Sequence, residues 1–211
     1  QILDQLGGQL RFIVSGASAI SKEVVQGFSD FGILTVQGYG LTETSPIISL
    51  NPIENFKIES VGRYFYPYME MKILDPDEKG IGEVCCKGPM VMKGYYNMPE
   101  ETAKAFTSDG FLHTGDLGYI KDNHIYLVGR RKNLIILSNG ENISPEEIEN
   151  KFADFTEVKE IVVIGENDKL IAEIYPDDVF LADKSDDEIK SVLEDHTNDL
   201  TIYLNRDADV C

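Results

Sequence analysis

The spacing of apolar and polar positions in residues 1–60 predicts a strand, a helix and a second strand. Apolar residues run through 10–14 and again through 33–36, and segment 21–31 between them has the spacing of an amphipathic helix. This succession predicts a βαβ unit, and sheets built from such units bind ligands beyond the carboxyl ends of their strands. Gly16 and Gly38 fall at those two ends, so we expect a ligand site there.

From about residue 61 the chain changes to short segments in which apolar and polar residues alternate, a pattern typical of antiparallel strands. We expect such strands at 69–74, 82–87, 117–121 and 125–128, with a short helix at 100–106. Together they predict a small antiparallel, barrel-like unit. Aromatic residues are expected to pack in its interior, namely Tyr64, Phe65, Tyr66 and Tyr68, and those of segment 92–96 are given the same structural interpretation.

A basic stretch at 130–132 precedes a third pattern. It is followed by an apolar segment at 134–137, the turn pair Asn139-Gly140, a helix that begins at Ser144, strands at 158–165 and 170–175, and a helix at 186–196. The expected fold is therefore mixed α/β and α+β. Residues 1–131 would hold the βαβ unit (1–60) and the β-rich subdomain (61–131), and residues 132–211 an incomplete, mobile α+β domain with its hinge near 130–132.

Charge and cysteine content narrow the function classes. The formal net charge of −18 argues against a nucleic-acid partner, because binding phosphates requires clustered lysine and arginine. Adjacent Cys85 and Cys86 would point to opposite faces of a strand, which favours buried thiols over a metal site or disulfide and indicates a reducing, cytoplasmic compartment. The sequence has no apolar run long enough to predict a membrane span, and peripheral contact with a membrane stays an alternative. The start at Gln1 leads us to expect a fragment of a longer chain.

Segment 38–43 has residue types suited to a nucleotide. The amides at Gly38 and Gly40 can approach an anion, the ring of Tyr39 can cover a base, the hydroxyl of Thr42 can bind a phosphate, and the carboxylate of Glu43 can hold a divalent cation. The alternative is that the two glycines only allow the chain to turn after a strand.

Two further stretches offer polar groups. Asp116 can accept both hydroxyls of a ribose, or it can simply begin an Asx-turn. Arg130, Arg131 and Lys132 can bind phosphate or sugar oxygens, or form a solvated basic turn. His113 and His124 lack a third partner at metal or triad spacing, so both are interpreted as structural.

Taken in order, the motifs resemble those of the adenylate-forming superfamily, which contains acyl-CoA synthetases, luciferases and peptide-synthetase adenylation domains. The matching segments are Ser15-Gly16-Ala17-Ser18, GYGLTE at 38–43, GE at 82–83, GP at 88–89, HTGD at 113–116 and GRRK at 129–132 continuing to 149. Ala17 replaces the second glycine of the family's turn. The form of the motifs is most similar to bacterial long- or medium-chain fatty acyl-CoA synthetases.

The resemblance implies roles for residues that match. Tyr39 would stack on adenine beside Gly16, Ala17 and Ser18, and Gly38 and Gly40 would belong to the nucleotide-binding turn. By the same resemblance, Thr42 would bind the α-phosphate and Glu43 would hold Mg²⁺. Asp116 would accept the ribose hydroxyls beside Arg130. Lys132 would lie at the hinge, and Asn139 and Gly140 would approach CoA.

The resemblance implies a reaction of two steps. ATP and a carboxylic acid, by the form of the motifs a fatty acid, give acyl-AMP and pyrophosphate, and CoA then displaces AMP. The family's phosphate loop and its C-terminal lysine motif are not present in the sequence, so this fragment is expected not to adenylate alone. Two alternatives are kept: an adenylating enzyme that passes the acyl group to a carrier protein, and a non-catalytic nucleotide-binding or interaction module.

Overall fold

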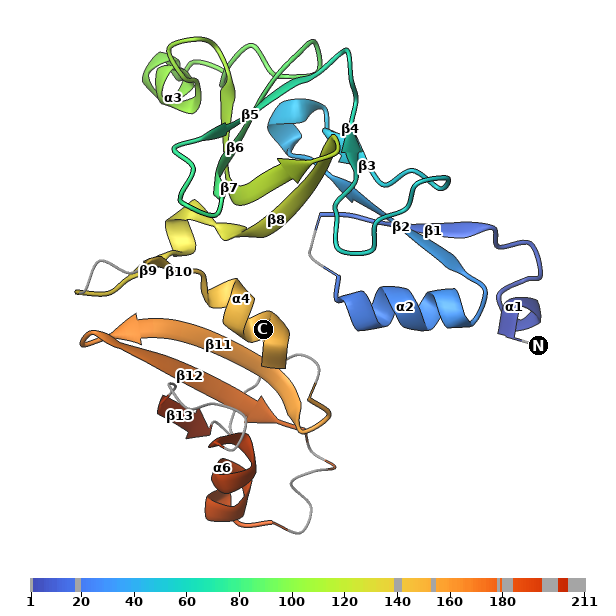
Figure 1. Cartoon of the computed structure of the whole chain (residues 1–211), viewed down its shortest axis with the longest axis vertical. Helices are drawn as coiled ribbons and strands as arrows, with labels where there is room; N and C mark the ends of the chain where they lie inside the picture. The colour runs from blue at the N-terminus through green and yellow to red at the C-terminus, as the bar shows by residue number, and fades with distance from the viewer. Residues whose placement is uncertain are drawn as a thin grey trace. The chain divides into compact units, whose positions relative to one another are not determined.

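The computed structural model of the chain describes residues 2–17, 20–138, 142–152, 155–177, 179, 184–194 and 201–204 (Figure 1). The chain divides into two compact units, residues 1–131 and residues 132–211, and each has a hydrophobic core of its own. Among the described residues, no helix combines the length and the apolar character needed to cross a bilayer.

The first unit contains an eight-stranded mixed sheet in the order β1-β2-β3-β4-β8-β7-β6-β5. Its strands are β1 (Phe12–Ser15), β2 (Leu34–Tyr39), β3 (Ser49–Leu50), β4 (Arg63–Tyr64), β5 (Glu70–Leu74), β6 (Gly82–Lys87), β7 (Leu112–Lys121) and β8 (His124–Arg130). Only β1 and β2 are parallel, and all the other neighbours are antiparallel. The mixed α/β fold class predicted from the sequence is therefore confirmed.

The helices of this unit are short. They are α1 (Ile2–Gln5), α2 (Lys22–Asp30) and α3 (Pro99–Ala105), with 3₁₀ turns η1 (Thr42–Thr44) and η2 (Arg131–Asn133), the last of which crosses into the second unit. Helix α2 connects β1 to β2 as predicted and lies beside them in Figure 1. The hydroxyl of Ser21 caps its first turn by accepting the amide of Val24, while Val25 is buried against the sheet.

Strand β7 is longer than the sequence predicted. It begins at Leu112, five residues before the expected start. The prediction was too short because a bulge interrupts the alternation of apolar residues in this strand. Cys85 of β6 pairs with His113, but Glu83, two residues away, pairs with Leu117, so β7 fits extra residues into the interval. Gly115 lies in this bulge with a φ of +75°, a conformation that glycine adopts readily.

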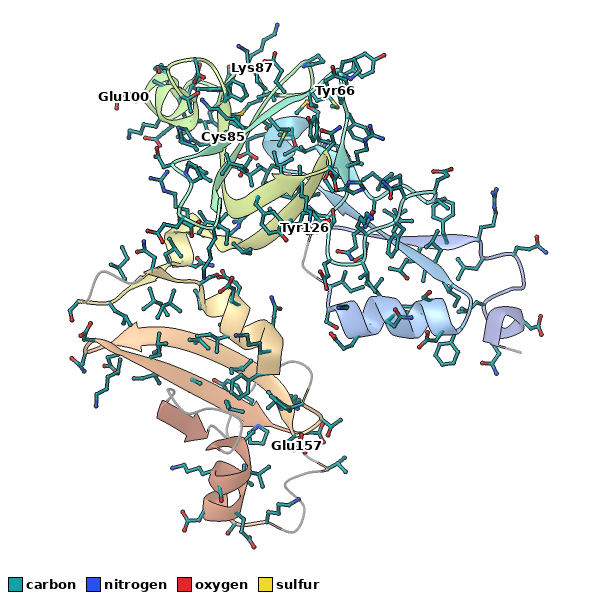
Figure 2. The ribbon with its side chains drawn as sticks, in the orientation of Figure 1. Tyr66, Cys85, Lys87, Glu100, Tyr126 and Glu157 are labelled. Atoms are coloured by element: carbon teal, nitrogen blue, oxygen red, sulfur yellow. The ribbon has the colours of Figure 1, made fainter. Side chains whose placement is uncertain are left out.

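The core of the first unit lies under the antiparallel strands. Its buried residues are Tyr39, Ile48, Met69, Val84, Cys86, Leu112 and Ile125. The expectation that the aromatic cluster at 64–68 packs inside is wrong for Phe65, Tyr66 and Tyr68, which are 36%, 67% and 70% exposed. The same expectation for segment 92–96 is wrong for Tyr96, which is 91% exposed. Phe65, Tyr66 and Tyr68 lie in the connection between β4 and β5, and Figure 2 shows Tyr66 at the edge of the first unit.

The second unit is a small α+β structure. It contains the hairpin of β9 (Ile135–Ile136) and β10 (Asn142–Ile143), helix α4 (Pro145–Phe152), strands β11 (Val158–Glu166), β12 (Lys169–Pro176) and β13 (Thr201–Leu204), and helix α6 (Asp186–Glu194). Strand β12 lies between β11, which is antiparallel to it, and β13, which is parallel. The helices and one face of this sheet form a common core of Phe152, Val163, Ala172, Ile174, Ile189 and Leu193.

Candidate nucleotide-binding site

The turn after β2 is fixed by close packing of its backbone. A side chain at Gly40 would place its Cβ 1.7 Å from the carbonyl oxygen of Pro46, so only glycine fits where the chain folds back. The buried hydroxyl of Thr44 accepts the amide of Leu41 at 2.9 Å and donates to carbonyl oxygens of the same turn. These bonds hold η1 in place, with Thr42 exposed and Glu43 half-buried on it.

The Glu43 carboxylate is oriented by a residue that lies far along the chain. The hydroxyl of Tyr95 donates to Glu43 Oε1 at 2.9 Å, and the amide of Met92 donates to the carbonyl oxygen of Glu43 at 2.7 Å. The hydrogen bond to Glu43 raises the pKa of Tyr95, so its hydroxyl keeps its proton as the donor. Segment 92–96 was expected only to pack, and the sequence alone gave no sign of this polar contact.

The bulge of β7 places the side chain of Asp116 next to Tyr39, the last residue of β2. Tyr39 donates its hydroxyl proton to Asp116 Oδ2 at 2.7 Å, and Arg130 Nε donates to Oδ1 at 2.8 Å. Asp116 is 5% exposed, and its amide donates to the hydroxyl of Thr114 at 3.1 Å. Burial, and next the negative charge of Asp116, raise the pKa of Tyr39 far above its ordinary value. The structure thus brings together two predicted site residues that are 77 positions apart.

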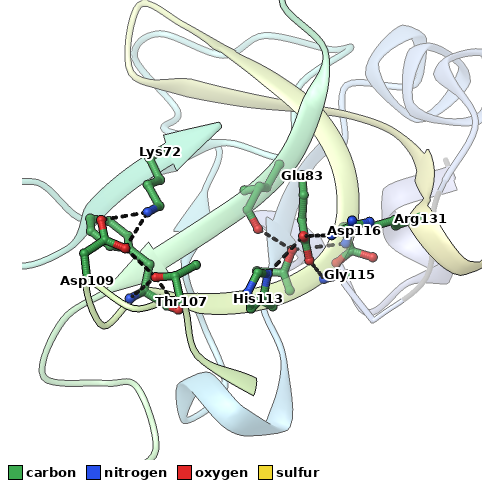
Figure 3. A network of polar contacts seen from close by, with 11 residues as sticks. Lys72, Glu83, Thr107, Asp109, His113, Gly115, Asp116 and Arg131 are labelled. Carbon is green, nitrogen blue, oxygen red and sulfur yellow. Dashed lines mark hydrogen bonds and ion pairs between the residues drawn. The ribbon is translucent and has the colours of Figure 1, made fainter. Parts of the chain in front are cut away.

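A second buried carboxylate, Glu83 on β6, supports the bulge from the neighbouring strand (Figure 3). Its Oε2 accepts Arg131 Nη1 at 2.6 Å and lies 3.0 Å from His113 Nδ1, while its Oε1 accepts the amide of Gly115 at 3.0 Å. Burial alone would raise the pKa of Glu83. The hydrogen bonds from His113, Gly115 and Arg131 outweigh burial, and the pKa is lowered.

The remaining predicted site residues lie as follows. Gly16, after β1, packs against the backbone of Gly38, since a Cβ on it would lie 3.4 Å from the Gly38 carbonyl oxygen. Ala17 has a φ of +68°, the left-handed conformation that the glycine expected there would adopt more easily. Lys132 is exposed in η2 and belongs to the second unit. Ser18, Asn139 and Gly140 lie outside the described residues.

The chain resembles known proteins in sequence and in fold. Residues 3–96, which include β1, α2 and the β2 turn, match the family described as AMP-binding enzyme. The peroxisomal long chain acyl-CoA synthetase 6 of Arabidopsis thaliana is 36% identical over 190 residues, which cover 84% of this chain and 27% of that protein.

Two further proteins extend the match. A chloroplastic long-chain-fatty-acid–[acyl-carrier-protein] ligase of Arabidopsis thaliana is 34% identical over 76% of this chain and 24% of its own length. The o-succinylbenzoate CoA synthetase of Bacillus subtilis, solved with an acyl-adenylate intermediate, has a TM-score of 0.77 and 27% identity, covering 97% of this chain and 45% of that one. The chain spans about a quarter of the length of these curated relatives.

Several groups at the candidate site were missed by sequence reasoning. Glu83 was interpreted as part of a strand and turn, and His113 as structural without a named partner. Their pairing depends on the cross-strand register of β6 and β7, which local patterns do not specify. One sign of Glu83 was nevertheless available in the sequence. It lies inside the apolar strand 82–87, where a buried acidic residue needs a partner.

Proposed function

We propose that this chain forms the adenosine-phosphate site of an enzyme that activates a carboxylic acid with ATP, giving acyl-AMP and pyrophosphate, and then transfers the acyl group to CoA. The observation that supports this most directly is the Tyr39–Asp116 hydrogen bond of 2.7 Å. It joins the turn after β2, with its glycines, hydroxyl and carboxylate, to a buried acidic residue with an arginine beside it. Such a grouping suits an aromatic base, a diol and a phosphate.

Each residue has a task that its environment permits. Tyr39 would bind adenine together with Gly16, Ala17 and Ser18, while Gly38 and Gly40 let the backbone approach the nucleotide. Asp116 would accept the ribose hydroxyls, because each carboxylate oxygen can accept a second hydrogen bond beyond the one from Tyr39 or Arg130. Thr42 is exposed and would donate its hydroxyl to the α-phosphate.

The residues around Glu43 fit Mg²⁺. A half-buried carboxylate with the exposed hydroxyl of Thr42 beside it offers oxygen ligands, and Mg²⁺ in nucleotide sites needs only one or two carboxylates besides phosphate oxygens and water. A bound ion would neutralise charge on the phosphates. Tyr95 would keep the Glu43 carboxylate oriented for it through the 2.9 Å hydrogen bond.

The second step would use residues near the boundary of the two units. Strand β8 ends at Arg130, and the chain divides between Arg131 and Lys132. A hinge at 130–132 would let one site serve both half-reactions, with Asn139 and Gly140 near the CoA arm. Relatives named as acyl-CoA synthetases favour a fatty acid and CoA, while the [acyl-carrier-protein] ligase keeps a carrier protein as the alternative acceptor. Relatives include peroxisomal and chloroplastic proteins, so a cytoplasmic location stays a prediction.

The nucleotide site is tested by measuring AMP and Mg-ATP binding to the chain by calorimetry. Asp116→Asn removes a charged acceptor and should weaken AMP binding about 10- to 100-fold. Asp122→Asn is the matched control, because Asp122 is exposed in the β7–β8 turn with a positive φ that asparagine tolerates. Equal binding by the two variants would contradict a ribose contact at Asp116.

The role of Glu43 is tested with two neighbouring tyrosines. Tyr95→Phe removes the hydroxyl that orients Glu43 and should weaken Mg²⁺-dependent ATP binding several-fold, on the scale of one hydrogen bond. Tyr96→Phe is the control, since Tyr96 is 91% exposed.

The activity itself is tested by ATP–pyrophosphate exchange with a panel of acids in a chain as long as its relatives, followed by addition of CoA or a carrier protein. AMP binding without exchange for any acid would favour a non-catalytic nucleotide-binding module.

A further inference from the structure

Three potential metal ligands meet on one face of the sheet formed by β6 and β7. Glu83 and Cys85 are two positions apart on β6, so their side chains project from the same face. His113 is the cross-strand partner of Cys85 on β7. One ligand atom from each residue lies within 4.8 Å of the other two, and Figure 3 shows Glu83 and His113 directed toward one another. Sequence spacing could not indicate this set, because it depends on strand register.

The three donors have the chemistry of a zinc site. A thiolate, an imidazole and a carboxylate are the ligands that Zn²⁺ prefers, and three protein ligands leave one position for water. In a tetrahedral site with bonds of roughly 2.0–2.3 Å, ligand atoms lie on the order of 3.3–3.8 Å apart. The ligand atoms lie within 4.8 Å of one another, so each pair needs to close by at most about 1.5 Å, which side-chain rotation on two paired strands can supply.

We propose that Glu83, Cys85 and His113 form a binding site for one divalent transition-metal ion of the Zn²⁺ class. On binding, the Cys85 S–H bond is replaced by a sulfur–metal bond and its proton leaves to the solvent. The two negative charges of thiolate and carboxylate then balance the charge of the ion, with the imidazole neutral. Cys85 and Glu83 are 0% and 4% exposed, and the ion enters from the side of His113, whose side chain is 28% exposed.

The neighbouring cysteine does not belong to the site. Cys86 projects from the opposite face of β6 and lies in the hydrophobic core of the first unit. Burial raises the pKa of both thiols, of Cys85 to about 11 and of Cys86 to about 12. Only Cys85 has an imidazole and a carboxylate beside it to stabilise a bound cation, so the two adjacent thiols should behave differently toward metal ions.

Arg131 competes with the ion for Glu83. Its guanidinium donates to Glu83 Oε2 at 2.6 Å, and the arginine side chain is 57% exposed. A metal ion at the carboxylate would send this guanidinium into solvent, where it can be hydrated. Removing its positive charge should therefore strengthen metal binding rather than weaken it. A purely structural cluster of Glu83, Cys85 and His113 would not show this effect.

The test is a titration of the full chain with Co²⁺, which reports tetrahedral thiolate coordination by its absorption bands. Because Cys211 lies outside the described residues, all variants are made in a Cys211→Ser background. We expect one Co²⁺ per chain with a thiolate-to-cobalt charge-transfer band, displaced by Zn²⁺. Cys85→Ser should abolish the band and Cys86→Ser should keep it. Absence of the band in the background protein, or its persistence in Cys85→Ser, would overturn the proposal.

Two further variants keep the test decisive if Cys85→Ser folds poorly. His113→Gln changes a half-buried ligand and should weaken Co²⁺ binding at least about 100-fold, since even changes outside the ligand set cost 10- to 100-fold. Arg131→Gln should tighten Co²⁺ binding several-fold. Unchanged affinity in His113→Gln, or weaker binding in Arg131→Gln, would contradict the assigned ligands. Circular dichroism confirms that each variant is folded.

Discussion

Asp116 and Glu83 have almost the same exposed fraction, 5% and 4%, and lie on the adjacent strands β7 and β6, yet their partners differ. Consecutive arginines bind them, Arg130 the aspartate and Arg131 the glutamate. Asp116 otherwise bonds Tyr39 at the end of β2, where the ligand site is proposed. Glu83 otherwise bonds its own scaffold, through the amide of the β7 bulge and the imidazole of His113.

Under the proposed function, this difference separates a residue that would contact the ligand from one that would position it. Glu83 holds the amide of Gly115, and Gly115 directly precedes Asp116, so the glutamate fixes the backbone from which the aspartate projects. Loss of Glu83 should therefore appear first in stability, and loss of Asp116 first in nucleotide binding. The predictions below separate these two roles.

The largest expected effect is the loss of stability in Glu83→Gln. The change removes the buried charge that binds Arg131 and His113 and should lower the free energy of unfolding by about 2–3 kcal/mol. Urea unfolding followed by circular dichroism measures it. Glu70→Gln, an exposed glutamate on β5, is the control and should change stability by less than about 0.5 kcal/mol. A loss no larger than in this control would show that Glu83 does not support the bulge.

The same contribution should depend on pH. Because the folded-state pKa of Glu83 lies below its ordinary value of 4.5, its stabilisation is complete above that value and is lost as the pH falls through the lower folded pKa. The difference in unfolding free energy between wild type and Glu83→Gln should thus be largest at about pH 7 and shrink toward about pH 3. Urea unfolding of both proteins at each pH measures it. A difference that grows in acid would mean that the pKa of Glu83 is raised.

Tyr39→Phe tests the Asp116 side of the comparison with a smaller change. Loss of the hydroxyl removes the 2.7 Å donor to Oδ2 and should lower the free energy of unfolding by about 1–2 kcal/mol, because a buried acceptor loses one partner. Tyr119→Phe is the control, since its ring stacks on Tyr126. AMP binding is measured in parallel, and it should weaken in Tyr39→Phe but not in the control.

Local patterns in the sequence predicted most of the elements. Helix α2 and strands β1, β2 and β6 lie where apolar spacing placed them, because each shows the period of its element. Strand β7 was predicted too short, since the bulge around Gly115 breaks the alternation on which the prediction depends. The exposed Tyr66 and Tyr68 were misassigned because composition alone does not reveal that a turn lies at the surface.

The contacts of the site were less predictable than its residues. Asp116, Tyr39 and Arg130 were named from local chemistry and resemblance, but the bonds between them connect three different strands. Glu83 was missed because its three partners are set by a bulge and by cross-strand register. Neither feature leaves a periodic trace in the sequence, so a buried acidic residue in an apolar strand was the only available sign.

The smallest effect, and the one that compares the two carboxylates most directly, comes from the adjacent arginines. Arg130→Gln and Arg131→Gln each remove one guanidinium that is about half exposed, so each should lower the free energy of unfolding by under about 1 kcal/mol. AMP binding should nevertheless weaken several-fold in Arg130→Gln, because Asp116 loses its cation, and change little in Arg131→Gln. Arg63→Gln, an exposed arginine of β4, is the control for the loss of positive charge. Equal losses of AMP affinity in the two variants would show that both carboxylates serve the nucleotide, and the division of roles between them would be wrong.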